Sequence, residues 1–202
     1  MKDTRTRLIE AARMLMIEQG VLEVSVAEIT QRAEANVALV SYHFKGREGL
    51  MLAIAKADAE LAIGDLDKLL ASDLTASEKI SRHITGIVRA YYQRPYLNRL
   101  LQKLLREGTH EAAEQVAAFF VKPVANARRQ IIHAGINSGE FRHVEPELIN
   151  FALEGACAQI FTSAEAREAV LGDSTMDDEL LERYAKSTAD LFIAGLQPRP
   201  LT

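Results

Sequence analysis

Two Glu-x-x-His patterns are the candidates for catalytic chemistry in this sequence. Glu107 stands three residues before His110, and Glu140 stands three residues before His143. A di-iron carboxylate site requires two such motifs, each on one face of a continuous helix, so that both ligands reach the core of a helical bundle. Here Gly108 interrupts the first motif, and the second lies in a connection between helices. Both positions count against a di-iron helical-bundle enzyme, which stays as an alternative.

A second group of residues suits nucleic-acid chemistry. The pentapeptide Ser41-Tyr42-His43-Phe44-Lys45 carries hydrogen-bond donors, a flat phenol and a cation, the groups that bind phosphates and base edges. It ends a short helical pattern of about two turns, which is small enough to enter the major groove of DNA. Tyr-His and His-Phe pairs in helices usually have a packing role. Whether this pair contacts DNA therefore depends on the surrounding sequence.

The elements that position these residues are all predicted to be helical, because no stretch alternates apolar and polar side chains as a half-buried strand does. We expect an all-α fold of about nine helices, with Ser25 and Glu28 as a capping box, Asn36 as an N-cap and a kink at Pro123. Thr162 would cap a further short helical piece. The expected helices cover residues 4–18, 26–33, 37–44, 47–71, 75–93, 95–107, 111–137, 146–161 and 175–195.

Composition supports a helical globular protein. The chain has 202 residues, of which 48% are hydrophobic and 26% charged, with 11 Gly and 5 Pro. The single cysteine excludes an intramolecular disulfide, and the most apolar window, residues 148–161, is too short for a membrane span. We expect a cytoplasmic protein without a signal peptide or membrane contact. Residues 1–50 contain seven basic and seven acidic side chains, so charge alone does not indicate DNA binding.

Three segments together resemble the DNA-binding domain of the TetR/AcrR family of transcriptional regulators: residues 29–33, 36–44 and 47–50. The C-terminal half resembles the family only in its helix count and in residues 139–142 and 145–148. The resemblance implies a three-helix helix-turn-helix domain at 1–46 and a helical ligand-binding and dimerisation domain at 47–202. It further implies a repressor, not an enzyme, that binds a pseudo-palindromic double-stranded operator as a homodimer and releases it when a small molecule binds.

Carried over position by position, the resemblance places a set of side chains on DNA. These are Ser25, Asn36, Val37, Ala38, Ser41, Tyr42, His43, Lys45 and Arg47. Three positions depart from the family pattern. Glu34 stands where the turn usually has Gly, Ala35 where it usually has Val, and Ser41 where Tyr is frequent. A non-Gly residue with positive φ costs about 1 kcal/mol, so Glu34 puts the turn geometry in question.

The C-terminal half carries two further expectations. The effector should be mostly apolar, because few polar groups lie among its candidate contacts, which are His83, Tyr91, Leu101, Leu105, Phe120, Val124 and Phe151. The segment 146–161 is apolar on more than one side, which a monomer's surface helix does not need. Its small residues and the last helix would form the dimer interface through Leu148, Ala152, Gly155, Ala156, Tyr184, Leu191 and Phe192.

Neither a cofactor nor a metal is expected. The remaining alternative is a helical regulator or scaffold without a small-molecule effector, which a fully packed C-terminal half would favour and an apolar cavity would oppose.

Overall fold

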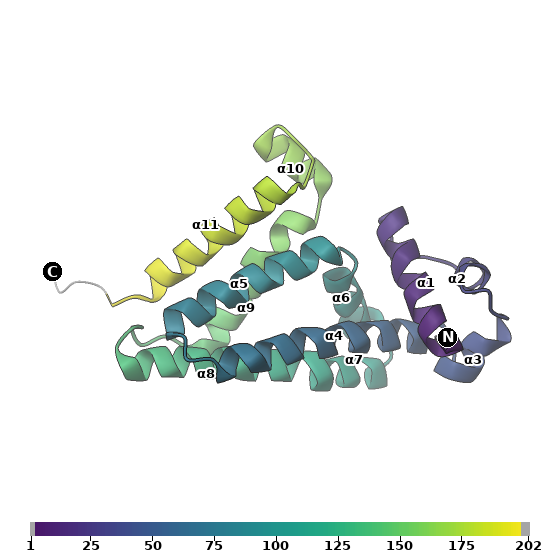
Figure 1. Cartoon of the computed structure of the whole chain (residues 1–202), viewed down its shortest axis with the longest axis horizontal. Helices are drawn as coiled ribbons and strands as arrows, with labels where there is room; N and C mark the ends of the chain where they lie inside the picture. The colour runs from purple at the N-terminus through teal and green to yellow at the C-terminus, as the bar shows by residue number, and fades with distance from the viewer. Residues whose placement is uncertain (1–2, 199–202) are drawn as a thin grey trace. The chain divides into compact units, whose positions relative to one another are not determined.

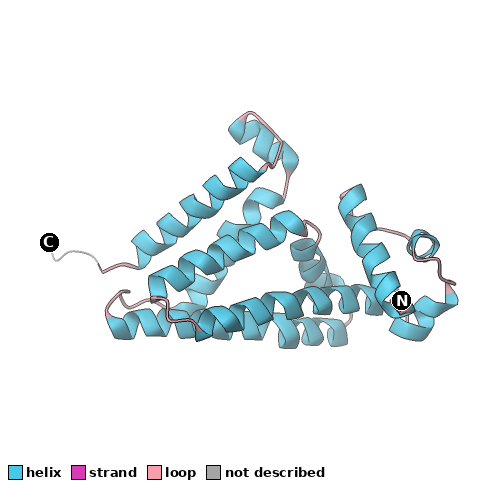
Figure 2. Cartoon of the chain, viewed as in Figure 1, coloured by secondary structure: helices cyan, strands magenta, loops and turns pink. Residues whose placement is uncertain are grey.

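Helices are the only regular elements in the part of the chain that the computed structural model describes, residues 3–198, as expected for an all-α fold (Figure 2). They are α1 (Thr4–Gln19), α2 (Val26–Arg32), α3 (Ala38–Phe44), α4 (Arg47–Ala71), α5 (Ala76–Gln93), α6 (Leu97–Glu107), α7 (His110–Val116), the π-helical turn η1 (Ala117–Val121), α8 (Lys122–Ser138), α9 (Pro146–Ala158), the 3-10 turn η2 (Gln159–Phe161), α10 (Ala164–Leu171) and α11 (Asp178–Leu196) (Figure 1).

The chain forms two compact units, each built from separate segments. The first contains the residues up to Leu61 and Arg94–Lys122, and the second contains Ala62–Gln93 and the residues from Pro123 onward. The expected domain boundary at residues 46 and 47 is not a break in packing. Leu50 and Ile54 of α4 share one apolar core with α1, α2 and α3, so the start of α4 belongs with the helix-turn-helix.

The first unit buries one stripe of α1. Leu8, Ala12 and Met16 recur at helical spacing and pack against Ile29 of α2 and Phe44 of α3. The helix ends where expected, because the residue after it, Gly20, adopts the left-handed conformation that stops a helix.

The turn between α2 and α3 forms despite its unusual sequence. Glu34 has a φ of 49°, so a non-glycine residue occupies the left-handed position. This is the position where the family pattern usually has Gly. The backbone N–H of Ala35 donates to the carbonyl of Thr30 at 2.9 Å, which closes the turn. The helix after it begins at Ala38, one residue later than expected. Asn36 still stabilises its first turn, since Asn36 Oδ1 accepts from the Ala38 N–H at 2.8 Å.

The expectation of one kinked helix over residues 111–137 is wrong in detail. The helical segment starts at His110, and its break is the π-helical turn η1, which ends just before Lys122 and Pro123. In this turn the Lys122 N–H bonds to the carbonyl of Ala117, five residues back. The wider turn moves the carbonyls relative to the proline ring, which would clash with the carbonyl four residues back in a regular α-helix.

The second unit packs α5 against α11, which Figure 1 shows side by side. Its core combines apolar residues of α5, α8, α9 and α11, among them Ile84, Ile132, Leu153 and Leu181. A capping box begins α5, since the Thr75 and Glu78 side chains each accept a backbone N–H of the other residue.

The turn at residues 139–142 connects three helices of the second unit. The Glu140 carboxylate accepts the backbone N–H groups of Ala76 and Ser77 at 3.1 and 3.0 Å, which occupies the first N–H groups of α5. Phe141 is buried against Gly135, where a Cβ would lie only 2.1 Å from the ring. Arg142 Nε donates to the carbonyl of Gly195 in α11 at 2.8 Å. The residue pattern in this turn therefore has a structural role.

Several helix ends differ from expectation, and α6 and α11 begin at Leu97 and Asp178 rather than at residues 95 and 175. The segment predicted as one helix over 146–161 is α-helical only to Ala158 and continues as η2. Ser163, rather than Thr162, caps α10, because its hydroxyl accepts the Ala166 N–H at 3.1 Å. Within the described residues no helix is both long and apolar enough to cross a membrane.

Candidate nucleic-acid interface

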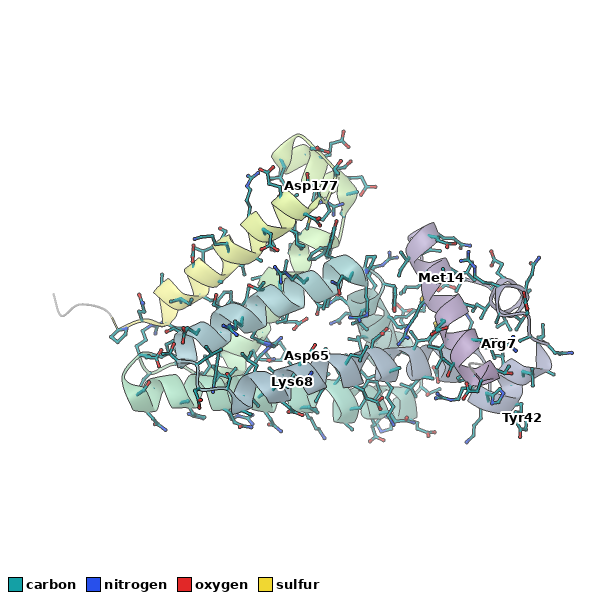
Figure 3. All side chains as sticks on the ribbon, viewed as in Figure 1. Arg7, Met14, Tyr42, Asp65, Lys68 and Asp177 are labelled. Atoms are coloured by element: carbon teal, nitrogen blue, oxygen red, sulfur yellow. The ribbon has the colours of Figure 1, made fainter. Side chains whose placement is uncertain are left out.

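The outer face of α3 is open to solvent. Val40 and Phe44 point into the core, whereas Ala38, Ser41 and Tyr42 are exposed. Tyr42 is 80% exposed and projects outward from the helix (Figure 3). A helix that buries one face and presents small and polar side chains on the other can enter a DNA groove without unfolding its own domain.

Aromatic packing orders the end of this helix. His43 is half-buried and lies edge-on to Tyr42, with the ring centroids 5.0 Å apart, and its ring centroid is 6.1 Å from that of Phe44. The imidazole is thus placed by neighbours on both sides. His43 therefore combines a ring that packs against its neighbours with an edge that stays partly exposed.

The expected DNA-contacting cations differ in their surroundings. Lys45 is exposed, has a φ of 59°, and makes no ion pair with another described residue. Arg47 instead donates to Glu23 at 3.1 Å and to the carbonyl of Leu22 at 3.5 Å. The Glu23 carboxylate, which also pairs with Lys103 at 3.0 Å, therefore offsets part of the charge that was expected to face DNA.

The Ser25 hydroxyl is also occupied. It accepts from the Glu28 N–H at 3.1 Å and donates to Glu28 Oε2 at 2.6 Å. Glu28 Oε2 also accepts the backbone N–H of Ser25 at 2.9 Å, which completes the predicted capping box. A phosphate at this position would have to displace the Glu28 carboxylate and overcome its negative charge. Ser25 and Arg47 thus each have an acidic neighbour that a DNA phosphate would have to displace or outweigh.

The segment after α3 depends on close backbone approach. A Cβ on Gly49 would lie 1.8 Å from the carbonyl oxygen of Phe44, so only glycine fits here. The neighbouring Glu48 accepts from the backbone N–H of Thr109 at 3.0 Å and from its hydroxyl at 2.7 Å. Sequence reasoning missed the contact between Glu48 and Thr109, because the two residues are far apart along the chain.

A buried carboxylate joins three segments of the first unit. Asp58 of α4 is 1% exposed, and its oxygens lie 2.7 Å from Arg13 of α1, 3.5 Å from Arg94 and 2.7 Å from the Tyr96 hydroxyl. Burial and the Asp58 carboxylate raise the pKa of Tyr96, so this hydroxyl stays protonated and donates. Sequence reasoning did not identify this cluster either.

The expected effector contacts fall in different surroundings. Leu101, Leu105 and Phe120 belong to the first unit, while His83, Tyr91, Val124 and Phe151 belong to the second. Phe151 is 75% exposed, so its assignment to an interior pocket is wrong. Several sides of its helix are apolar, and sequence periodicity could not tell which one faces inward.

Two of these residues take part in a buried polar cluster centred on Arg128 of α8. Arg128 donates through Nε to His83 Nε2 at 2.8 Å, through Nη1 to Asn150 Oδ1 at 2.8 Å and through Nη2 to Glu154 Oε2 at 2.9 Å. The Tyr91 hydroxyl donates to the other Glu154 oxygen. Burial, with the nearby Arg128 charge, lowers the pKa of His83 to about 3, so the imidazole is neutral and accepts this bond.

Some of the expected dimer contacts form an exposed stripe on α9. Leu148, Ala152 and Gly155 of α9 are exposed at helical spacing, and Phe151 lies among them. Ala156 of α9 is half-buried. On α11, Leu191 is exposed, and Tyr184 and Phe192 are half-buried. This stripe has no covering partner among the described residues of the same chain.

A groove of about 530 Å³ in the first unit is mostly charged. It is lined by Val21, Leu22, Glu23, Arg99, Gln102, Lys103, Arg106 and Glu107, and contains none of the expected effector contacts. In residues 3–198 no three His, Cys, Asp or Glu side chains come together as metal ligands. The Glu-x-x-His motifs lie at the α6–α7 junction and in the turn before α9, so neither occupies one helix face.

Comparison with known proteins agrees with this arrangement. Residues 8–54 match the family model described as bacterial regulatory proteins, tetR family, and residues 73–199 match the tetracyclin repressor-like C-terminal domain. The probable HTH-type transcriptional regulator YttP of Bacillus subtilis is 48% identical over 48 residues, which are 24% of this chain and 23% of YttP. The HTH-type transcriptional repressor NicS of Pseudomonas putida is 23% identical over 141 residues, 69% of this chain and 66% of NicS. The matches thus span less than two thirds of either relative.

Solved structures show the same fold at low identity. FadR from Bacillus subtilis, determined with stearoyl-CoA, has a TM-score of 0.75 and 21% identity over 95% of this chain and 99% of that one. A regulatory protein of the tetR family from Rhodococcus RHA1 has a TM-score of 0.77 and 18% identity, covering 99% of this chain and 100% of its own. Together with the two family models, the helix-turn-helix geometry leads to one conclusion: the chain belongs to the TetR family of DNA-binding transcriptional regulators, which are not enzymes.

Proposed function

We propose that this protein is a repressor that binds a pseudo-palindromic operator as a homodimer and leaves it when an apolar small molecule binds. The observation that carries the DNA-binding part is the exposed face of α3, which ends in an anchored imidazole and an unpaired Lys45. The operator would be part of the chromosomal DNA, so the protein would act in the cytoplasm. NicS, a relative over part of its length, is named a repressor.

Different residues would read and hold the operator. Val37, Ala38 and Ser41 are exposed near the start of α3, where short side chains can contact base edges and thymine methyl groups. Tyr42, His43 and Lys45 would hold phosphates and fix the register on the duplex. Asn36 would act mainly by capping α3, because its side-chain oxygen already accepts a backbone N–H.

The test begins with selection of bound sequences from a random duplex library, followed by titrations of the selected operator over a range of salt. Lys45→Ala should weaken binding to every duplex and reduce the salt slope by about 0.9 for each protomer. His43→Ala should also weaken binding, whereas Val37→Ala should change the preferred sequence. Lys68→Ala is the matched control, because this exposed lysine pairs with Asp65 on a distant part of α4. Unchanged binding by both Lys45→Ala and His43→Ala would mean that α3 is not the recognition helix.

The dimer is proposed from the exposed stripe on α9. Apolar side chains at helical spacing, with Ala152 and Gly155 between them, permit a close helix-to-helix contact across a twofold axis. Phe151→Glu should convert the dimer to monomer in sedimentation experiments at micromolar concentration. Val170→Glu is the control, since Val170 is also an exposed apolar residue but lies on α10. Equal dissociation by both variants would move the interface away from α9.

The effector is proposed to be mostly apolar. The polar atoms of His83 and Tyr91 already bond to Arg128 and Glu154, which leaves shape and apolar contact as the main basis of recognition in the second unit. The solved FadR structure holds stearoyl-CoA, a ligand with a long apolar chain. Thermal-shift measurements with stearoyl-CoA, octadecanoic acid and coenzyme A alone would separate a response to the acyl chain from one to the nucleotide.

Release from the operator requires only a modest preference of the effector for the released state. A hundredfold loss of operator affinity corresponds to about 2.7 kcal/mol of differential binding. The continuous helix α4 contributes residues to both units, so we propose it as the coupling element. If no apolar compound raised the melting temperature or released the operator, the alternative of a regulator without a small-molecule effector would replace this proposal.

A further inference from the structure

Half of the cations near the recognition helix are paired with acids of the same unit. Residues 3–47 contain six Lys and Arg side chains. Three of them form ion pairs, with 2.7 Å between Arg13 and Asp58, 2.6 Å between Arg32 and Glu18, and 3.1 Å between Arg47 and Glu23. An arginine already paired with a carboxylate offers little net attraction to a phosphate. Only the remaining three cations are candidates for the DNA backbone.

Of these three, two are fully available. Arg7 is half-buried and donates to the Thr4 hydroxyl at 3.4 Å, while its Nε is buried without a partner. Lys45 is already proposed as a phosphate contact. Arg5 is exposed and has no hydrogen bond or ion pair with any other described residue. Arg5 is thus the one unpaired, exposed arginine in this part of the first unit.

Arg5 is placed beside the end of the recognition helix. Its guanidinium carbon lies 5.4 Å from the centroid of the Phe44 ring, within the range of a cation–π contact. Phe44 is the last residue of α3, directly after His43. A guanidinium held by a ring keeps its N–H groups free at the edges, so stacking orients this side chain without consuming its donors.

We infer that Arg5 of α1 is an additional contact to the DNA backbone, set in position by Phe44 next to Tyr42, His43 and Lys45. This inference rests on the proposed placement of α3 in the major groove. It extends the binding surface to a second helix, and it gives the buried Phe44 ring a second role in placing the Arg5 guanidinium. The contact is to phosphate, so it strengthens binding to any sequence.

Asp3 limits the strength of this contact. The Thr6 backbone N–H donates to Asp3 Oδ1 at 2.6 Å and lowers the pKa of Asp3, and the positive charge of Arg5 lowers it further. Asp3 is therefore ionised at neutral pH and close to Arg5. The carboxylate caps α1 but repels phosphate, so replacement by a neutral capping residue should tighten DNA binding.

The experiment measures binding of a fluorescent mixed-sequence duplex of about 30 base pairs, long enough for two half-sites, over a range of salt. Arg5→Ala should weaken binding about fivefold for each protomer at physiological salt and lower the salt slope by about 0.9 for each protomer. Arg5→Lys should retain most of the slope, and Asp3→Ser should increase affinity while keeping the cap. Arg32→Ala is the matched control, since Arg32 is already paired with Glu18.

The outcomes separate the two proposals. If Lys45→Ala weakens binding but Arg5→Ala changes neither affinity nor slope, the inference about Arg5 is wrong and the proposed function stands. If neither variant weakens binding, the placement of α3 is wrong. A lower melting temperature of Arg5→Ala with an unchanged salt slope would assign Arg5 a purely structural role and overturn the inference.

Discussion

Among the residues that the structure describes, each unit buries one charged side chain, but the two units compensate it in opposite ways. In the first unit the buried group is an acid, Asp58, which has two arginines and a tyrosine as partners. In the second unit the buried group is a base, Arg128, which has one acid, Glu154, and two neutral acceptors. Breaking a buried pair is costly mainly when it leaves a charge without compensation. Asp58 can lose one partner and remain paired, whereas Arg128 cannot.

The largest effect is expected from Glu154→Gln. Arg128 has a side chain that is only 5% exposed and would lose its counter-charge, while Tyr91 could still donate to the new amide oxygen. We expect a loss of about 3 kcal/mol in the free energy of unfolding and a melting temperature lower by about 6–12 °C. Glu147→Gln is the control, because Glu147 pairs with Arg129 at the exposed surface. Equal small losses in both variants would show that Arg128 gains little from Glu154.

The pH dependence of stability should distinguish the Arg128 cluster from the Asp58 cluster, with an effect of intermediate size. The pKa of His83 is lowered to about 3 in the folded state by burial and by Arg128, below an unfolded value of about 6.5. The unfolded chain therefore binds a proton first as pH falls, so stability is complete above about pH 6.5 and declines below it. The expected loss between about pH 7 and pH 5 is roughly 2 kcal/mol.

The control for this pH effect is His83→Gln, whose amide oxygen can still accept from Arg128 without titrating. Denaturant titrations of this variant should show a flatter dependence on pH over the same range. Tyr96 of the first unit should contribute nothing there, because its raised pKa keeps the hydroxyl protonated. An equally steep pH dependence in His83→Gln would contradict the assignment to His83.

Arg13→Ala should have a smaller effect than Glu154→Gln. Asp58 keeps Arg94 and Tyr96 as partners, and Arg13 is 24% exposed, so we expect a loss of about 1.5 kcal/mol. The comparison predicts coupling between partners: Arg13→Ala combined with Tyr96→Phe should cost more than the sum of the single variants, since Asp58 then loses two of its three contacts. Additive losses in urea titrations would mean that the partners act independently.

The smallest effect is expected at an exposed ion pair. Arg89 and Glu182 lie 2.6 Å apart on α5 and α11, but both side chains are more than half exposed. Arg89→Ala should lower stability by about 0.5 kcal/mol, and the loss should shrink as salt is added. A loss as large as that of Arg13→Ala would show that burial is not what separates these pairs.

Local features of the fold could be predicted from the sequence because their causes lie within a few residues. The bounds of α4, the capping boxes at Ser25 and Thr75 and the left-handed Glu34 all follow from side chains next to the backbone groups they affect. The exposed face of α3 was also expected, since helical spacing separates Val40 and Phe44 from Ser41 and Tyr42.

Contacts with residues distant in sequence determine which of the predicted site residues are free to bind DNA or an effector. From the sequence, Arg47 was expected on DNA and Phe151 in a pocket. In the structure Arg47 pairs with Glu23, and Phe151 is exposed on the surface of α9. Spacing determines which side chains share a helix face, and a capping pattern determines where a helix begins. Only the packing of helices determines which face is covered and which charges meet, because contacts such as Glu48–Thr109 and Arg128–Glu154 bring together residues from different helices.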